Sequence, residues 1–92
     1  MSATATTWIV EAEIMPKRGV NDPQGDAVLS GLKLLGFSAA DNVRVGKLIR
    51  LEVSASSKDD ALDQGRQMCE KLLANPVIEE FELRVSDAGS EG

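Results

Sequence analysis

An expected strand and an expected helix meet at the stretch Lys17-Arg18-Gly19-Val20-Asn21-Asp22-Pro23-Gln24-Gly25-Asp26-Ala27-Val28. Asp22 followed by Pro23 is typical of a helix N-cap with proline at the first helical position, where no N–H is needed. Gly19 allows a turn at positive φ after the strand. Gly25 lies in the first helical turn, where glycine destabilises a helix by roughly 0.5–1 kcal/mol relative to alanine. Such a glycine often lets another backbone approach closely, so the stretch indicates either a contact site at the strand–helix corner or a well-capped loop.

The residues on either side of this stretch carry patterns that predict a strand before it and a helix after it. Residues 8–15 alternate between two sides, as in a half-buried strand. Residues 23–35 carry apolar side chains at helical spacing, and Gly36 is the residue type that commonly follows a helix end. Residues 37–42 are then expected to form a connecting loop.

The second half of the chain predicts a hairpin, a helix and a last strand. Residues 43–55 are a hairpin candidate with Gly46-Lys47 at the turn, since a Gly-X pair suits a type II′ connection. A serine at 56–57 caps the next helix, which stops at Asn75-Pro76 because the residue before proline is pushed out of the α region. Residues 77–85 alternate again. The side chains expected to face the helices are Trp8, Val10, Ala12, Ile14, Ile49, Leu51, Val53, Ala55, Phe81, Leu83 and Val85.

These elements follow the order βαββαβ, which predicts an α+β, ferredoxin-like fold. We expect a four-stranded antiparallel sheet with two helices on one face, in a single domain over 8–85. Residues 1–7 are expected to be a disordered N-terminal tail, and 86–92 a polar C-terminal tail. The other sheet face is expected to carry Glu11, Glu13, Arg44, Arg50, Glu52, Glu80, Glu82 and Arg84. This charged face predicts either a solvated surface or a polar interface with a second copy.

The composition excludes several classes of function. The 92 residues carry 10 Lys and Arg against 15 Asp and Glu, which argues against a nucleic-acid partner and an anionic membrane surface. With no histidine and one cysteine, neither a Cys/His zinc site nor an internal disulfide is possible. No signal peptide or membrane span is predicted, so we expect a cytoplasmic protein. A chain this short has a thin core, which favours association with other chains.

No group of residues in the sequence predicts catalysis by this chain alone. A serine or cysteine nucleophile would need a base beside it, usually histidine, and Cys69 lies on an apolar helix face as a small core residue. Glu79 and Glu80 point to opposite faces of a strand, and Asp59-Asp60 fits the first turn of a helix, where acidic residues are favourable. The sequence therefore predicts no catalytic residue and no cofactor or metal bound by this chain.

Three segments together resemble a known family. They are Lys17-Arg18-Gly19-Val20-Asn21-Asp22-Pro23-Gln24-Gly25, Val43-Arg44-Val45-Gly46-Lys47, and Met68-Cys69-Glu70-Lys71-Leu72-Leu73-Ala74-Asn75-Pro76-Val77-Ile78-Glu79. In order and spacing, from about Trp8 to Val85, the chain resembles the PurS family of small subunits of phosphoribosylformylglycinamidine synthase. Arg18 lies where the family often has proline, and Asn21 where it often has an apolar residue, so the detail of this loop departs from the family pattern.

The resemblance implies a non-catalytic subunit of a complex in purine biosynthesis. In this family a glutaminase subunit releases ammonia from glutamine. A large synthetase subunit uses ATP and magnesium to activate formylglycinamide ribonucleotide, and ammonia then displaces the phosphate. The small subunit, as a dimer, bridges the two enzymes and assists ammonia transfer. The implied partners are thus the two larger subunits and further copies of this chain, as a dimer or a tetramer.

The same resemblance places partner contact on particular residues of this sequence. Those in the first loop and helix start are Lys17, Gly19, Asp22, Pro23, Gln24 and Gly25, and a second set is Arg44, Gly46, Lys47, Asn75 and Pro76. Asp22, Pro23, Asn75 and Pro76 are equally explained as helix start and stop signals. Gln24, Lys17 and Arg44 have no comparable structural explanation and carry more of the prediction.

Two other classes of function remain open on the residues alone. A small-molecule-sensing module of the ACT type shares the βαββαβ order and would bind an amino acid near Gly19 and Gly25. A free-standing enzyme like acylphosphatase would need an arginine and an asparagine in the first loop. Arg18 and Asn21 lie in that loop, but their setting does not match.

Overall fold

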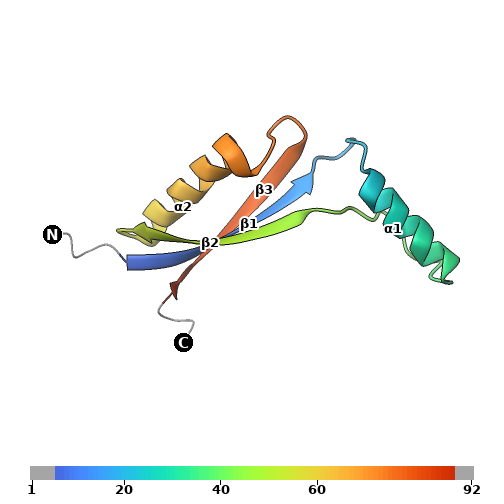
Figure 1. The fold of residues 1–92 in the computed structure, drawn as a ribbon, viewed down its shortest axis with the longest axis horizontal. Coiled ribbons are helices and arrows are strands. Elements are labelled where there is room, and N and C mark those ends of the chain that lie inside the picture. Colours follow the sequence, from blue (N-terminus) through green and yellow to red (C-terminus); the bar gives the residue numbers. More distant parts are fainter. Residues whose placement is uncertain (1–5, 89–92) are drawn as a thin grey trace.

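The computed structural model describes residues 6–88 of the chain. Its elements, in order, are β1 (Thr6–Pro16), α1 (Pro23–Leu34), β2 (Lys47–Ala55), α2 (Lys58–Met68), the π-helix η1 (Cys69–Leu73) and β3 (Glu79–Asp87) (Figure 1). The limits of the first and last strands lie up to two residues from the predicted ones. Residues 1–5 and 89–92 of the expected tails lie outside the described residues. No helix between residues 6 and 88 is long and apolar enough to cross a membrane.

The sheet has three antiparallel strands in the order β2-β1-β3, so the predicted four-stranded sheet is wrong. The missing strand is the first arm of the expected hairpin, residues 43–45, which pairs with no strand. Gly46 does not have the positive φ that a type II′ turn requires at its first central position. The N–H of Val45 donates instead to the Asp22 carboxylate, so this segment is held at the start of α1.

The core lies between α2 and one face of the sheet, on the side that the alternation predicts. Its buried members are Val10, Ala12, Ile14, Val53, Ala55, Ala61, Cys69 and Ala74. Gly65 lets α2 approach the central strand, because a Cβ at this position would lie 2.9 Å from Cγ1 of Val10. Phe81, Leu83 and Val85 pack against this core from β3, as predicted.

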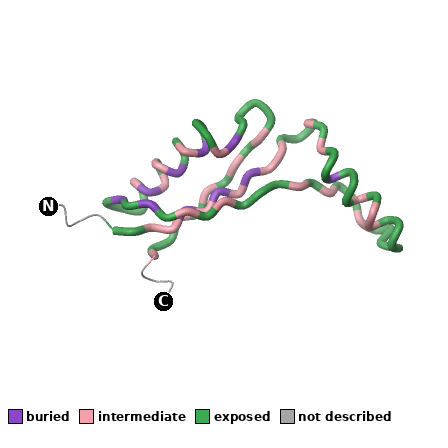
Figure 2. Tube along the Cα trace, viewed as in Figure 1, coloured by how far each residue is buried: buried purple, intermediate pink, exposed green. Residues whose placement is uncertain are grey.

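Only one of the two helices covers the sheet, which corrects the expectation that both do. α2 lies on the sheet, whereas α1 projects beyond the end at which β1 stops and β2 begins (Figure 1). α1 makes no extensive contact with any strand or with α2. Gly25 is its single buried residue, and Figure 2 shows the helix as almost entirely exposed or intermediate. The start of α1 is attached to residues 43–45, and this attachment holds the helix in its position.

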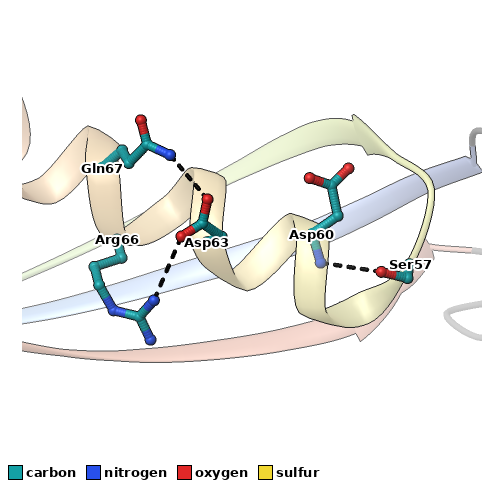
Figure 3. A network of polar contacts seen from close by, with 5 residues as sticks. All are labelled: Ser57, Asp60, Asp63, Arg66 and Gln67. Carbon is teal, nitrogen blue, oxygen red and sulfur yellow. Dashed lines mark hydrogen bonds and ion pairs between the residues drawn. The ribbon is translucent and has the colours of Figure 1, made fainter.

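The helix ends follow the predicted capping signals. Asp22 is the N-cap of α1 with proline next to it, and Gly36 beyond the helix has φ +100°. The N–H of Asp60 donates to the Ser57 hydroxyl at 3.1 Å at the start of α2, and Asp63 pairs with Arg66 and Gln67 along the outer side of that helix (Figure 3). The last turn widens into η1, which the sequence pattern did not predict, and ends before Asn75-Pro76.

Charged side chains cover the sheet face opposite α2. Glu11 forms an ion pair with Arg50 at 2.7 Å, and Glu13 with Arg84 at 3.9 Å, across neighbouring strands. Arg44 was expected on this face but lies in the segment before β2. The face therefore carries five acidic residues, Glu11, Glu13, Glu52, Glu80 and Glu82, and two basic residues, Arg50 and Arg84.

Candidate functional site

The corner between β1 and α1 is built around the carboxylate of Asp22. One of its oxygens accepts the N–H of Gly25 and the other accepts the N–H of Val45, both at 3.0 Å. Gly25 is buried, and a Cβ there would collide with the carbonyl oxygen of Val43. The close backbone approach predicted at Gly25 is therefore confirmed. These contacts join the first turn of α1 to the segment before β2.

The pKa of the Asp22 carboxyl lies below its ordinary value. The main cause is the hydrogen bond from Val45, followed by the hydrogen bond from Gly25. Partial desolvation opposes these effects, and the positive charge of Arg44 and the backbone N–H of Gln24 add smaller contributions in the same lowering direction. A carboxylate that accepts several backbone N–H groups is stabilised in its ionised form, so the corner is held by a negative charge near neutral pH.

Lys17 connects this corner to the loop between η1 and β3. Its ammonium group donates to the carbonyl oxygen of Pro76 at 2.6 Å, and its backbone N–H donates to the carbonyl oxygen of Ile78 at 2.8 Å. In that loop, the Asn75 side chain accepts the N–H of Val77 at 3.1 Å. The structure thus brings Lys17, Asn75 and Pro76 together, although they lie far apart in the sequence.

Two of the predicted site glycines have local structural reasons. Gly19 has φ +82°, a conformation that side-chain-bearing residues rarely adopt. Gly46 lies against the end of β1, where a Cβ would collide with the carbonyl oxygen of Ile14 and the sulfur of Met15. Their presence follows from the fold and does not require a partner.

Three of the predicted site residues keep their side chains free. The side chains of Gln24, Arg44 and Lys47 are exposed and form no hydrogen bond or ion pair within the part of the chain that the structure describes. Gln24 projects from the first turn of α1, whereas the two cations lie just before and at the start of β2. A rigid backbone corner therefore presents free polar groups to solvent, an arrangement suited to contact with another protein.

An open hollow of about 670 Å³ lies beside this corner. Its charged and polar lining includes Lys17, Arg18, Asn21, Asp22, Asp26 and Arg44. Arg18, Asn21 and Asp26 were not among the predicted contact residues. Arg18 and Asn21 depart from the family pattern, since each replaces a less polar residue in the loop that borders the hollow. This departure is the sequence signal that could have indicated them.

The arrangement offers no nucleophile for catalysis at this corner. Cys69 is fully buried in the core, remote in sequence from the corner. Burial, with a smaller effect from the charge of Glu70, raises the pKa of its thiol. The thiol therefore stays protonated near neutral pH. Within residues 6–88, no three His, Cys, Asp or Glu side chains lie together where they could hold a metal ion.

Comparison with known sequences gives a consistent result over nearly the whole chain. Residues 9–87 match the profile of the family described as PurS, phosphoribosylformylglycinamidine (FGAM) synthase. The chain belongs to the PurS family. The FGAM synthase subunit PurS of Archaeoglobus fulgidus is 43% identical over 75 residues, which cover 82% of this chain and 94% of that protein. The Bacillus subtilis PurS subunit is 39% identical over 79 residues, covering 85% and 92%.

Solved PurS structures share the fold of this chain. The crystal structure of the Thermotoga maritima PurS subunit superimposes with a TM-score of 0.82 at 32% identity, covering 89% of this chain and 94% of that one. A chain in the structure described as PurLQS from the same organism gives a TM-score of 0.79 at 32% identity, covering 87% and 98%. Membership of this family makes the chain a small subunit of FGAM synthase, a ligase of purine biosynthesis, and not a catalyst in its own right.

Proposed function

We propose that this chain bridges the glutaminase and the large synthetase subunits of FGAM synthase, so that ammonia passes between them. The observation that carries the proposal is the similarity to a chain in the PurLQS structure of T. maritima, over 98% of that chain's length. In this proposal the synthetase subunit uses ATP and magnesium, and this chain binds neither. The complex acts in the cytoplasm, and the small subunit associates with further copies of itself.

The β1–α1 corner supports this role through its chemistry. The backbone is fixed by the two hydrogen bonds to Asp22, so little conformational freedom is lost when a partner binds. Gln24, Arg44 and Lys47 are exposed and have no side-chain partner within residues 6–88. Lys17 makes its carbonyl contact with Pro76 while lining the neighbouring hollow. We propose Lys17, Gln24, Arg44 and Lys47 as the partner-contacting groups, with the remaining predicted residues shaping the backbone that presents them.

A reconstitution assay tests the bridging role. The matching synthetase and glutaminase receive glutamine, ATP, magnesium and formylglycinamide ribonucleotide, and this chain is titrated in. A parallel reaction contains ammonium in place of glutamine. We expect glutamine-dependent turnover only when the chain is present, and ammonium-dependent turnover that barely needs it.

Matched variants locate the contact. Gln24→Ala and Arg44→Ala are expected to raise the concentration of chain needed for half-maximal glutamine-dependent turnover by about tenfold each, as expected for interface polar groups worth about 1–2 kcal/mol. Gln67→Ala and Lys58→Ala remove an amide and a cation from α2 and are expected to leave this concentration unchanged. If all four variants changed this concentration equally, the contact would not be specific to the β1–α1 corner.

The reconstitution assay can also overturn the proposal. A chain that changes neither reaction and does not co-elute with the larger enzymes would overturn the bridging role. A rise in melting temperature with glycine or serine, without any response to the enzymes, would then support the amino-acid-sensing alternative.

A further inference from the structure

The end of the second helix exposes a leucine that regular helical spacing would direct toward the core. In α2, Ala61 and Gly65 are buried, and Met68 packs against the same core cluster. A regular α-helix that continued these steps of three and four residues would place Leu72 next on this face. Leu72 is instead 82% exposed. The chain therefore withdraws a leucine from the face that packs on the sheet.

The π-helix η1 is the cause of this exposure. Its hydrogen bonds span five residues, and the N–H of Ala74 donates to the carbonyl oxygen of Cys69 at 2.9 Å. Cys69 and Ala74 are both buried, and Leu73 packs against their cluster. The wider turn thus gives the core position to Leu73 and leaves Leu72 outside. Because π-helical turns are rare and frequently occur at functional sites, the exposed leucine indicates a contact with another molecule.

The loop that follows η1 exposes two more apolar side chains on a fixed backbone. Val77 is 77% exposed and Ile78 is 42% exposed, and Figure 2 shows the loop on the outside of the molecule. The N–H of Val77 donates to the Asn75 side chain, and the N–H of Ile78 donates to the Asn75 carbonyl oxygen. The N–H of Asn75 in turn donates to the Glu79 carboxylate at 2.7 Å. A backbone held in this way loses little conformational freedom when its exposed apolar side chains are covered by a partner.

Size and symmetry favour a larger subunit over a second copy as that partner. We call the exposed side chains of Leu72, Val77 and Ile78 the loop surface. One side of a standard interface supplies roughly 20–30 residues, so the loop surface is too small to hold two copies together by itself. A contact between it and a different surface of another copy would be head-to-tail, and such contacts build rings or open filaments rather than a closed dimer.

Lys17 makes the loop surface continuous with the β1–α1 corner. Its ammonium group donates to the carbonyl oxygen of Pro76 at 2.6 Å, while its side chain lines the hollow beside the corner. The loop and the corner lie at the same end of the sheet, because Pro16 pairs with Glu79 there (Figure 1). Accessible surface increases with protein size, so the large synthetase subunit offers the broader surface for covering both.

From these observations we infer that the loop surface docks into an apolar pocket of the large synthetase subunit. The inference rests on the proposed function and adds an apolar anchor to the polar groups of the corner. Apolar anchors in water-excluding pockets, surrounded by polar contacts, commonly supply most of the binding energy of an interface. In this arrangement Leu72 and Val77 enter the pocket, and the exposed cation Lys71 lies at its edge.

Photo-crosslinking in the reconstituted complex tests which molecule covers the loop surface. A benzophenone maleimide is attached to the Cys69→Ala/Leu72→Cys variant, which is mixed with the matching synthetase and glutaminase, glutamine, ATP and magnesium. We expect an adduct with the synthetase. The same label on Cys69→Ala/Leu48→Cys, where the leucine is 56% exposed on the opposite sheet face, should give little adduct. An adduct with the glutaminase or with a second copy, or no adduct at all, would overturn the inference.

The reconstitution assay gives an independent measurement without a label. Leu72→Ser/Val77→Ser should raise the concentration of chain needed for half-maximal glutamine-dependent turnover by roughly 100-fold, since two apolar side chains leave the contact. Leu48→Ser should leave this concentration unchanged. If the unmodified chain supports turnover and the double variant supports it equally well, the inference fails and the bridging role stands. If the unmodified chain supports no turnover, the bridging role itself fails.

Discussion

At the scale of single residues, Asp22 and Gly25 carry most of the information about the candidate site. Both stand out in the sequence, one as a helix cap and the other as an unexpected glycine, and the structure shows that they act together. The Asp22 carboxylate binds the N–H groups of Gly25 and Val45, and the missing side chain at Gly25 leaves room for the Val43 carbonyl. A polar contact and a packing contact thus hold the same corner, and each can be tested separately.

Substitution of Gly25 by alanine should destabilise the protein. A Cβ would collide with the Val43 carbonyl and the Asp22 carboxylate, so we expect a loss of about 1–3 kcal/mol in the free energy of unfolding. Gly31→Ala is the matched control in the same helix. Nothing lies within 4 Å of the position that its Cβ would take, so this variant should gain about 0.5–1 kcal/mol from helix propensity. Urea denaturation measures both, and a Gly25→Ala variant as stable as the Gly31→Ala variant would contradict the close contact.

Asp22→Asn should change how stability depends on pH. The pKa of Asp22 is lowered in the folded state, so its contribution is fully present above the ordinary value of 3.8 and is lost as the pH falls through the lowered folded value. We expect the variant to be less stable than the unmodified chain at pH 7, with the difference shrinking as the pH falls below about 4. Denaturation at several pH values measures this.

The thiol of Cys69 should be unreactive in the folded protein. It is fully buried, and burial raises its pKa. We expect its reaction with a disulfide reagent at pH 8 to be roughly 100-fold slower than in denaturant, because modification requires opening of the core. A Cys69→Ala/Ser38→Cys variant, with its cysteine on an exposed loop, should react at the same rate in both conditions. Rapid modification of native Cys69 would show that the core is open.

At the scale of the elements, β1 organises the fold because it is the central strand. It pairs with both other strands and supplies Val10, Ala12 and Ile14 to the core. The capping signals, turn glycines and alternating faces placed most elements close to their observed limits. They did not reveal η1, because a π-helical turn has no apolar period of its own in so short a segment.

Substitutions on the two faces of the sheet should have unequal effects. Ile14→Ala removes a fully buried side chain of β1 and should lower the free energy of unfolding by about 2–5 kcal/mol. Leu48→Ala affects a side chain on the opposite face that is 56% exposed, and should change this free energy by about 0.5 kcal/mol or less. Thermal or urea denaturation compares them. Similar losses would mean that the face opposite α2 is also covered.

At the scale of the whole molecule, the chain is elongated because α1 extends past the sheet (Figure 1). Its family places it in a multi-subunit ligase, and its free side chains and its apolar helix lie at the same end of the sheet. We therefore propose that residues 17–47, together with the loop surface, are the part of the molecule that makes contact with other chains. The sheet and α2 form the scaffold that holds it.

Short sequence patterns were enough to predict the alternating strands, the helix caps and the residues of the β1–α1 corner, and three such segments in order predicted the family. A cap, a turn or a face is a local property, since it is specified within a few positions of the sequence. The arrangement of residues 43–46 and α1 depends instead on contacts between distant segments. The Gly46-Lys47 pair was compatible with a hairpin, but the Asp22 carboxylate, 23 positions before Val45, accepts the N–H of that residue. This long-range hydrogen bond removes the fourth strand and directs α1 away from the sheet.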